Sequence, residues 1–118
     1  MNNLVLAYLG DAVYELYIRE ALIKQGIAKV NDLQKKSLEY VSATSQRRIL
    51  ESLITKNIFS EEEKELINRG RNMASHKNKS TDIITYKKAT GLECLIGYLY
   101  LHNRVRLDEI MKAIVGEV

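Results

Sequence analysis

The sequence predicts an all-α protein that folds as a single domain over residues 1–118. The chain contains no proline and only six glycines, so few positions interrupt a helix. Apolar residues also recur at helical spacing, for example at Ile49, Leu50, Leu53 and Ile54. A chain of this length can bury about two-thirds of its unfolded surface, which is enough for a hydrophobic core.

The remaining composition limits the classes of function. The single cysteine, Cys94, excludes an internal disulfide bond and fits a reducing cytosol. The sequence has neither a signal peptide nor an apolar run of about 18 residues that could span a membrane, so a cytoplasmic protein is expected. The net charge of +3 is compatible with a nucleic-acid partner but does not require one.

Caps and apolar stripes predict the helices in order. The expected helices cover residues 3–24, 30 or 31 to 41, 45–55, 61–68, 81 or 82 to about 103, and 107–115. Ser42 or Thr44 caps the third helix. Ser60 and Glu63 have the spacing of a capping box at the start of the fourth helix, and Gly70 is expected to end it.

Two apolar stretches far apart in the sequence each contain one acidic residue. Residues 4–15 read LVLAYLGDAVYE and hold Asp11, and residues 89–101 read ATGLECLIGYLYL and hold Glu93. Helices that are apolar on nearly every side belong at the centre of a domain, so both are expected to be buried and to cross. Small residues such as Gly10 would allow a close crossing. We therefore expect Asp11 and Glu93 to face each other.

A buried carboxylate is costly unless a neighbouring group compensates it. An ion pair of Asp11 or Glu93 with a lysine or arginine is the common structural solution. Two close carboxylates can instead share a proton or bind a hard cation. The cation alternative fits metal-dependent hydrolysis of a phosphodiester, because Mg²⁺ needs only one or two carboxylates when water and phosphate oxygens complete its shell.

A basic, polar segment follows the predicted fourth helix. Residues 69–79, RGRNMASHKNK, predict a flexible phosphate-binding loop, with a solvated surface loop as the alternative. Arg47 and Arg48 lie near a helix N-terminus, where the helix dipole disfavours cations, so they either face a polyanion or are solvated. The candidate nucleic-acid contacts are Lys35, Lys36, Arg47, Arg48, Arg69, Arg71, Asn72, His76, Lys77 and Lys79.

The segment LAYLGDAVYE, at residues 6–15, resembles the ribonuclease III signature, and the whole chain resembles Mini-III, the short bacterial form of that family. Three further blocks carry the resemblance in the expected order: KKSLEYVSATSQ, RGRN and TDIITYKKATGLECLIGYLYL. The resemblance implies a ribonuclease III endonuclease-domain-like helical bundle that acts as a homodimer on double-stranded RNA. It also implies a need for Mg²⁺, products with 5′-phosphate and 3′-hydroxyl ends, and a large-subunit ribosomal RNA precursor as substrate.

The resemblance also implies roles for individual residues. By position, the family's catalytic and metal-binding acids fall on Asp11 and Glu93. Leu4, Ala7 and Thr90 stand where ordinary ribonuclease III has further acids, so more water in the metal shell and a weak affinity for the ion are expected. The alternative function is a catalytically inactive domain that binds structured RNA as a scaffold. Loss of both acids would favour that alternative, and both are present.

A homodimer has a physical motive in this interpretation. One site cuts one strand, whereas a two-fold axis supplies one site for each strand of a duplex. Leu4, Val5 and Tyr8, at the start of the first helix, are the expected interface. Side chains cannot read the deep major groove of A-form RNA, so binding is expected to depend on shape, phosphates and 2′-hydroxyls.

Overall fold

The computed structural model describes residues 1–74 and 82–118, and these residues form α-helices joined by short connections, without a strand. The all-α prediction is therefore confirmed. The helices are α1 (Asn3–Lys24), α2 (Val30–Val41), α3 (Ala43–Thr55), α4 (Glu61–Met73), α5 (Ile83–His102) and α6 (Arg104–Val115). None of the helices in this described part is both long and apolar enough to cross a lipid bilayer.

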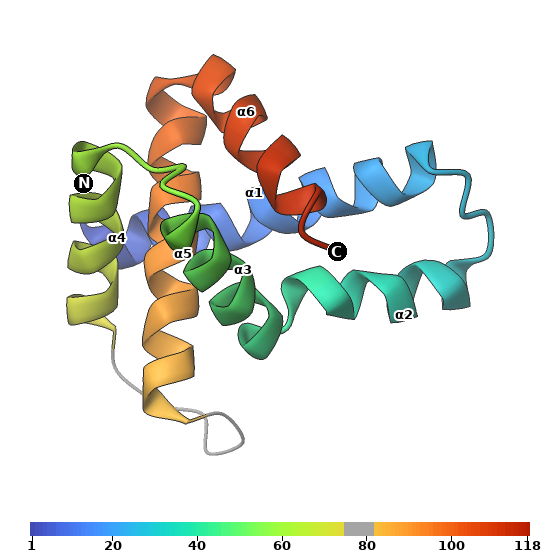
Figure 1. Ribbon diagram of the computed structural model, residues 1–118, viewed down its shortest axis with the longest axis horizontal. Coiled ribbons are helices and arrows are strands. Elements are labelled where there is room, and N and C mark those ends of the chain that lie inside the picture. The colour runs from blue at the N-terminus through green and yellow to red at the C-terminus, as the bar shows by residue number, and fades with distance from the viewer. Residues whose placement is uncertain (75–81) are drawn as a thin grey trace.

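The central helix is α5, and the other helices pack around it (Figure 1). Its most extensive contacts are with α1, which crosses behind it in this view, followed by those with α4 and α3. After a connection of one residue, Asn103, α6 folds back over the bundle. α2 returns beside the second half of α1, so these two segments form an arm that extends away from the rest of the molecule (Figure 1).

The hydrophobic core lies between α5 and the helices around it. Its fully buried side chains include Tyr14, Ile18, Ile49, Leu92, Leu95, Ile96, Leu107 and Ile110. A buried phenol needs a hydrogen-bond partner, and the hydroxyl of Tyr14 donates a bond of 2.7 Å to the backbone oxygen of Tyr40. This bond fixes the end of α2 against α1.

The crossing of α1 and α5 depends on two glycines. A Cβ atom at Gly10 would lie 1.8 Å from the backbone oxygen of Glu93, and one at Gly97 would lie 2.0 Å from the backbone oxygen of Leu6. Any larger residue would collide with backbone atoms, which cannot move aside as a flexible side chain can. The predicted close crossing is confirmed, and it brings the helix of Asp11 against the helix of Glu93.

The fourth helix is longer than predicted. α4 continues through Gly70 to Met73, whereas the sequence predicted an end at Asn68. The reason is that Gly70 faces α5, where an added Cβ would lie 2.6 Å from the Cβ of Cys94. This glycine therefore serves close helix packing and does not terminate the helix.

The sixth helix also begins earlier than predicted, at Arg104 and not at Leu107. Its cap is Asn103, whose side chain accepts a hydrogen bond from a backbone N–H of the first turn. The predicted capping box at the start of α4 is confirmed: Ser60 accepts from the backbone N–H of Glu63, and the Glu63 carboxylate accepts from that of Ser60.

Candidate active site

Asp11 and Glu93 come together where α1 crosses α5, as the sequence predicted. Both carboxyl groups line one pocket of about 280 Å³, and the charge of Asp11 acts on Glu93. The other residues of this pocket are Leu4, Ala7, Tyr8, Tyr86 and Thr90. Leu4, Ala7 and Thr90, which carry no carboxylate, therefore all lie around the acid pair.

Asp11 is exposed, and the prediction that it is buried is wrong. It lies on a face of α1 that also carries Leu4 and Tyr8, seven and three residues earlier, whose exposed fractions are 38 % and 84 %. The apolar residues of this face remain outside the core, so α1 is not buried on all sides. Glu93 is only partly exposed on the central helix. The pair therefore lies at the edge of the core, with Asp11 on the side open to solvent.

The surroundings of Glu93 favour its protonated form. Burial, together with the hydrogen bond to Asp11 and the charge of Asp11, raises the pKa of Glu93 to about 8. A contact with Gln46 acts in the opposite direction. A pKa of about 8 favours the protonated form of Glu93 at neutral pH, which allows it to lie near Asp11 without two adjacent negative charges.

A third polar side chain in this region was not predicted from the sequence. Gln46, on the first turn of α3, is 3 % exposed, and its Nε2 lies 3.4 Å from Oε2 of Glu93. Its spacing could have revealed it, because Gln46 precedes Ile49, Leu50 and Leu53 by three, four and seven residues and so belongs to the buried stripe of α3. A polar residue at a buried position of a helix indicates a specific partner.

A second pocket lies on the α3 side of Glu93. It has a volume of about 330 Å³ and includes Gln46 but not Asp11. The residues that line both pockets are Tyr86, Thr90 and Glu93, all on α5. The Thr90 hydroxyl donates a hydrogen bond of 2.9 Å to the backbone oxygen of Tyr86. Glu93 is therefore approached by Asp11 from one pocket and by Gln46 from the other.

The acid pair is not part of a structural ion pair among the residues that the structure describes. The ion pairs of residues 1–74 and 82–118 involve neither Asp11 nor Glu93. In the same part of the chain, no cluster of three or more histidines, cysteines or acidic residues could hold a metal ion. The donors gathered here are therefore two carboxyl groups, with one neighbouring amide.

The predicted basic loop is a helix over its first part. Arg69, Arg71 and Asn72 lie on the last turns of α4 with exposed side chains, so the prediction that a loop begins at Arg69 is wrong. Arg69 forms an ion pair with Glu65, one turn earlier. The predicted contacts that lie outside the described residues are His76, Lys77 and Lys79.

Arg47 has partners within the chain, so a polyanion is not needed to explain its place at a helix start. Its guanidinium donates a hydrogen bond of 3.0 Å to Oγ1 of Thr85 and forms ion pairs with Glu51 and Asp82. Glu51 also pairs with Lys88. These contacts join α3 to the first turns of α5.

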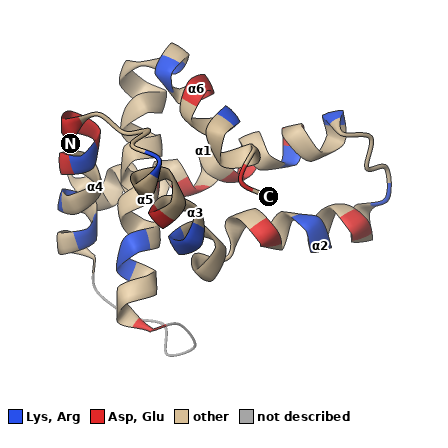
Figure 2. Ribbon diagram, in the orientation of Figure 1, with Lys and Arg blue, Asp and Glu red and all other residues tan. Residues whose placement is uncertain are grey.

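The other basic candidates are spread over several helices. Lys35 and Lys36 lie on α2, and Lys36 pairs with Glu39 at 3.0 Å. Arg48 of α3 donates a hydrogen bond to the backbone oxygen of Glu39. Figure 2 shows lysines and arginines on α2, α3, α4 and α5 with acidic residues among them, and this view contains no continuous basic face.

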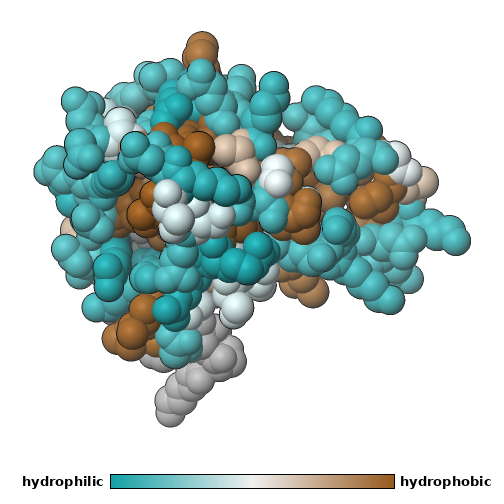
Figure 3. Space-filling model, viewed as in Figure 1, coloured by the Kyte–Doolittle hydropathy of each residue, from teal (hydrophilic) through white to brown (hydrophobic). Residues whose placement is uncertain are grey.

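An apolar groove lies apart from the acid pair, between α1 and α2. It has a volume of about 480 Å³ and shares no residue with the Asp11–Glu93 pocket. Its apolar lining consists of Ile23, Val30, Leu33, Leu38 and Val41. Figure 3 shows apolar residues exposed between the helices of this arm, on a face that is otherwise mostly hydrophilic.

The sequence and the fold match a known protein family. The Ribonuclease III domain family matches residues 4–104, which include nearly all of the two helices that carry Asp11 and Glu93. This all-α domain is therefore a ribonuclease III domain.

Relatives of similar length define the branch of the family. Mini-ribonuclease 3 of Streptococcus pneumoniae is 39 % identical, over all of this chain and 94 % of its own length. Mini-ribonuclease 3 of Staphylococcus aureus is 43 % identical, over 98 % and 87 %. A crystal structure of a Fusobacterium nucleatum protein superposes with a TM-score of 0.80 at 34 % identity, covering 98 % of this chain and 90 % of that one. The chain belongs to the Mini-ribonuclease 3 branch of the ribonuclease III family and is an endoribonuclease.

Proposed function

We propose that this endoribonuclease cleaves double-stranded RNA with the help of Mg²⁺, and that its substrate is a precursor of large-subunit ribosomal RNA. The observation that carries the proposal is the Asp11–Glu93 pair. The two carboxyl groups line an open pocket and lack a lysine or arginine ion pair within the described residues. The choice of ribosomal RNA follows from the resemblance of the sequence to its family.

The donor set fits Mg²⁺. Carboxylate oxygens are preferred ligands of this hard cation, which keeps several waters when a protein offers one or two carboxylates. Asp11 and Glu93 would hold the ion, and the pocket of about 280 Å³ leaves room for water. Leu4, Ala7 and Thr90 supply no carboxylate there, so a highly hydrated ion and a low affinity are expected. When bound, the ion supplies an acidified water and neutralises charge that develops on the phosphate.

The two acids differ in exposure, and this suggests different tasks. Asp11 lies on the exposed face of α1 and can meet a phosphate that approaches from outside. Glu93 is anchored on the central helix, between Asp11 and Gln46. A phosphodiester of a duplex can approach this pocket only from the surface, so the side of Asp11 is the proposed entrance.

The test replaces each carboxylate by an amide of the same shape. Asp11→Asn and Glu93→Gln are each expected to lower kcat by about 100-fold or more, because several kcal/mol of charge stabilisation are lost. Cleavage is measured on a base-paired ribosomal RNA precursor, on an unrelated duplex and on the separated strands, each with Mg²⁺ and with EDTA. Glu20→Gln, which changes an exposed acid on the same helix, serves as the matched control and should cleave like the wild type.

Several outcomes would contradict parts of the proposal. Full cleavage by either variant, or by the wild type in EDTA, would exclude the metal site. Equal cleavage of separated strands would exclude the preference for duplexes. A wild-type chain that binds a duplex without cutting it would identify the inactive RNA-binding scaffold.

The proposed enzyme acts as a homodimer. Leu4, Val5 and Tyr8 are exposed at the start of α1, and burial of this apolar surface against a second copy would stabilise a dimer. Leu4 and Tyr8 also line the Asp11–Glu93 pocket, so the interface would adjoin each site. Two sites related by a two-fold axis could then cut the two strands of one duplex.

The proposed RNA contacts are exposed basic side chains. Lys35, Arg48 and Arg71 are exposed on three different helices, whereas Arg47 is already held by partners within the chain. Contacts of this kind neutralise phosphates and release counterions, so the affinity for a duplex should fall steeply as salt is added.

A further inference from the structure

Gln46 occupies a position where an apolar residue would be expected. It lies on the buried stripe of α3, and the three residues that share this stripe are Ile49, Leu50 and Leu53. Burying an amide costs about 1–3 kcal/mol unless it finds hydrogen-bond partners. The partner of its Nε2 is Oε2 of Glu93, 47 residues away in the sequence. A partner on the proposed metal site gives this residue a role beyond packing.

The helix that carries Gln46 is held firmly. Ser42 caps α3 by accepting a hydrogen bond of 3.1 Å from the backbone N–H of Ser45. The buried stripe then packs α3 into the core next to α5. The Gln46 amide therefore reaches Glu93 from a fixed direction. It does so from one pocket, while Asp11 reaches Glu93 from the other. A side chain held from one side in this way has less freedom to rotate away from its partner on the other side.

We propose that Gln46 is a positioning residue, whose buried amide holds the carboxylate of Glu93 toward Asp11 so that the two acids together bind a divalent cation. The inference rests on the proposed function of the acid pair. Groups that orient metal ligands without touching the metal commonly change affinity or activity about 10- to 100-fold when removed. Gln46 does not touch the RNA in this role, since it is only 3 % exposed.

The first experiment uses Gln46→Met, which keeps an unbranched side chain of similar length and removes the amide. The probe is Mn²⁺ alone, and free Mn²⁺ is measured by electron paramagnetic resonance. The Kd for Mn²⁺ is expected to rise about tenfold, with an unchanged or higher melting temperature. In cleavage assays kcat should fall while KM for the duplex stays constant. Gln34→Met, the same change at an exposed site on α2, should leave both the Kd for Mn²⁺ and the cleavage kinetics unchanged.

A second measurement does not depend on a variant of Gln46. In the wild-type chain labelled with ¹⁵N, the side-chain amide resonances of Gln46 should shift when Mg²⁺ is added, and those of Gln34 should not. Glu93→Gln should abolish the shift at Gln46. This experiment remains informative even if Gln46→Met fails to fold.

The outcomes separate this inference from the function on which it rests. The positioning role would be overturned by an unchanged Mn²⁺ affinity in a folded Gln46→Met, or by Gln46 amide resonances that do not shift with Mg²⁺. In that case Glu93→Gln would still weaken Mn²⁺ binding and lower the cleavage rate. If Glu93→Gln itself binds Mn²⁺ and cleaves like the wild type, the proposed metal site fails, and the positioning role fails with it.

Discussion

Three helices contribute the groups that set the ionisation of Glu93. It is carried by α5, approached by Asp11 of α1 and contacted by Gln46 of α3. Burial and the neighbouring acid both disfavour its charged form, and the contact with Gln46 favours it. The folded chain therefore holds a proton on Glu93 more tightly than the unfolded chain does, and this difference makes stability depend on pH.

In EDTA, the free energy of unfolding is expected to fall as the pH rises from about 4.5 to about 8. Across this interval the folded chain keeps a proton on Glu93 that the unfolded chain releases. The stabilisation is complete below the ordinary pKa of 4.5 and is lost as the pH passes the raised pKa of about 8. Glu93→Gln cannot titrate and should remove this slope. Urea denaturation at a series of pH values measures it, and identical slopes in the two proteins would contradict the prediction.

The glycines at the helix crossing define a second prediction for single residues. Gly10→Ala places a Cβ 1.8 Å from the backbone oxygen of Glu93, so α1 and α5 must move apart. Overpacking of this kind costs about 1–3 kcal/mol or more of unfolding free energy, and it should separate Asp11 from Glu93 and lower cleavage. Thermal denaturation and the cleavage rate measure both effects.

Gly116→Ala is the matched control for this substitution. Its Cβ would meet the nearest backbone oxygens at 3.5 Å, which is an ordinary contact, so stability should change by no more than about 0.5 kcal/mol. A Gly10→Ala variant as stable and active as the control would show that the helices can separate without cost.

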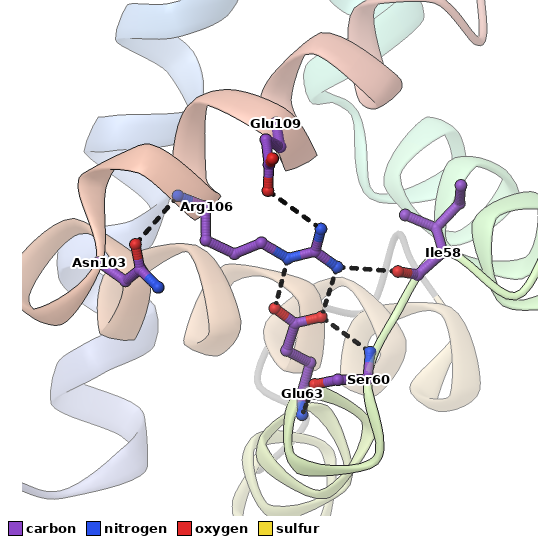
Figure 4. Close-up of polar contacts among 6 residues, drawn as sticks. All are labelled: Ile58, Ser60, Glu63, Asn103, Arg106 and Glu109. Atoms are coloured by element: carbon purple, nitrogen blue, oxygen red, sulfur yellow. Dashed lines mark hydrogen bonds and ion pairs between the residues drawn. The ribbon is translucent and has the colours of Figure 1, made fainter.

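At the scale of elements, one ion pair joins the start of α4 to α6. Arg106 makes two hydrogen bonds of 2.8 Å to the Glu63 carboxylate and one of 2.8 Å to the backbone oxygen of Ile58 (Figure 4). The same carboxylate completes the capping box with Ser60. Glu63 is only 7 % exposed and Arg106 is partly buried, so the pair is partly shielded from water, and it connects α4, α6 and the turn before α4.

Glu63→Gln is expected to lower the free energy of unfolding by about 2–4 kcal/mol at neutral pH, since it removes the buried carboxylate from the Arg106 guanidinium and leaves, within the described residues, only the exposed Glu109 as a charged partner. The hydrogen bonds from Arg106 hold the pKa of Glu63 below its ordinary value of 4.5. The stabilisation is therefore present above pH 4.5 and is lost as the pH falls through the lowered pKa. The difference between wild type and variant in urea denaturation should shrink in acid.

Glu109→Gln provides the matched control for this ion pair. Glu109 contacts the same guanidinium through one bond of 3.3 Å and is exposed, so its loss should cost less than about 1 kcal/mol. Equal losses in the two variants, or a Glu63→Gln effect that persists unchanged in acid, would contradict this account.

At the scale of the whole molecule, the exposed apolar face at the start of α1 is the proposed interface of a homodimer. Tyr8 is 84 % exposed and lies beside Asp11 in the same pocket. Tyr8→Glu puts a charge in the proposed interface and should convert a dimer of twice 13.5 kDa into a single chain of that mass. Sedimentation measures this change, and double-strand cuts should give way to slow nicking of one strand.

Val105→Glu changes an apolar residue that is 74 % exposed on α6 and serves as the control. It should leave the mass and the products unchanged. A wild-type chain that sediments as a monomer, or a Tyr8→Glu variant that remains a dimer, would exclude the proposed interface.

Local chemistry explains what could be predicted from the sequence. A capping box needs two residues three positions apart, so Ser60 and Glu63 identify the start of α4 without knowledge of the fold. The apolar character of the helices around Asp11 and Glu93 places both at the centre, and two central helices of a small domain meet. The acid pair was predictable for this reason.

The tertiary structure alone decided which faces of these elements are covered. Asp11 is exposed because the first turns of α1 keep one apolar side outside the core, and Gly70 continues a helix because α5 lies against it. Arg47 finds its partners on α5, and Glu63 meets Arg106 from 43 residues away. The sequence by itself determined the helices, the capping box at the start of α4 and the two most apolar helices, which carry the acids, since these depend on neighbours within a few positions. Burial and pairing between distant residues depend on how the helices pack, and no local pattern contains that information.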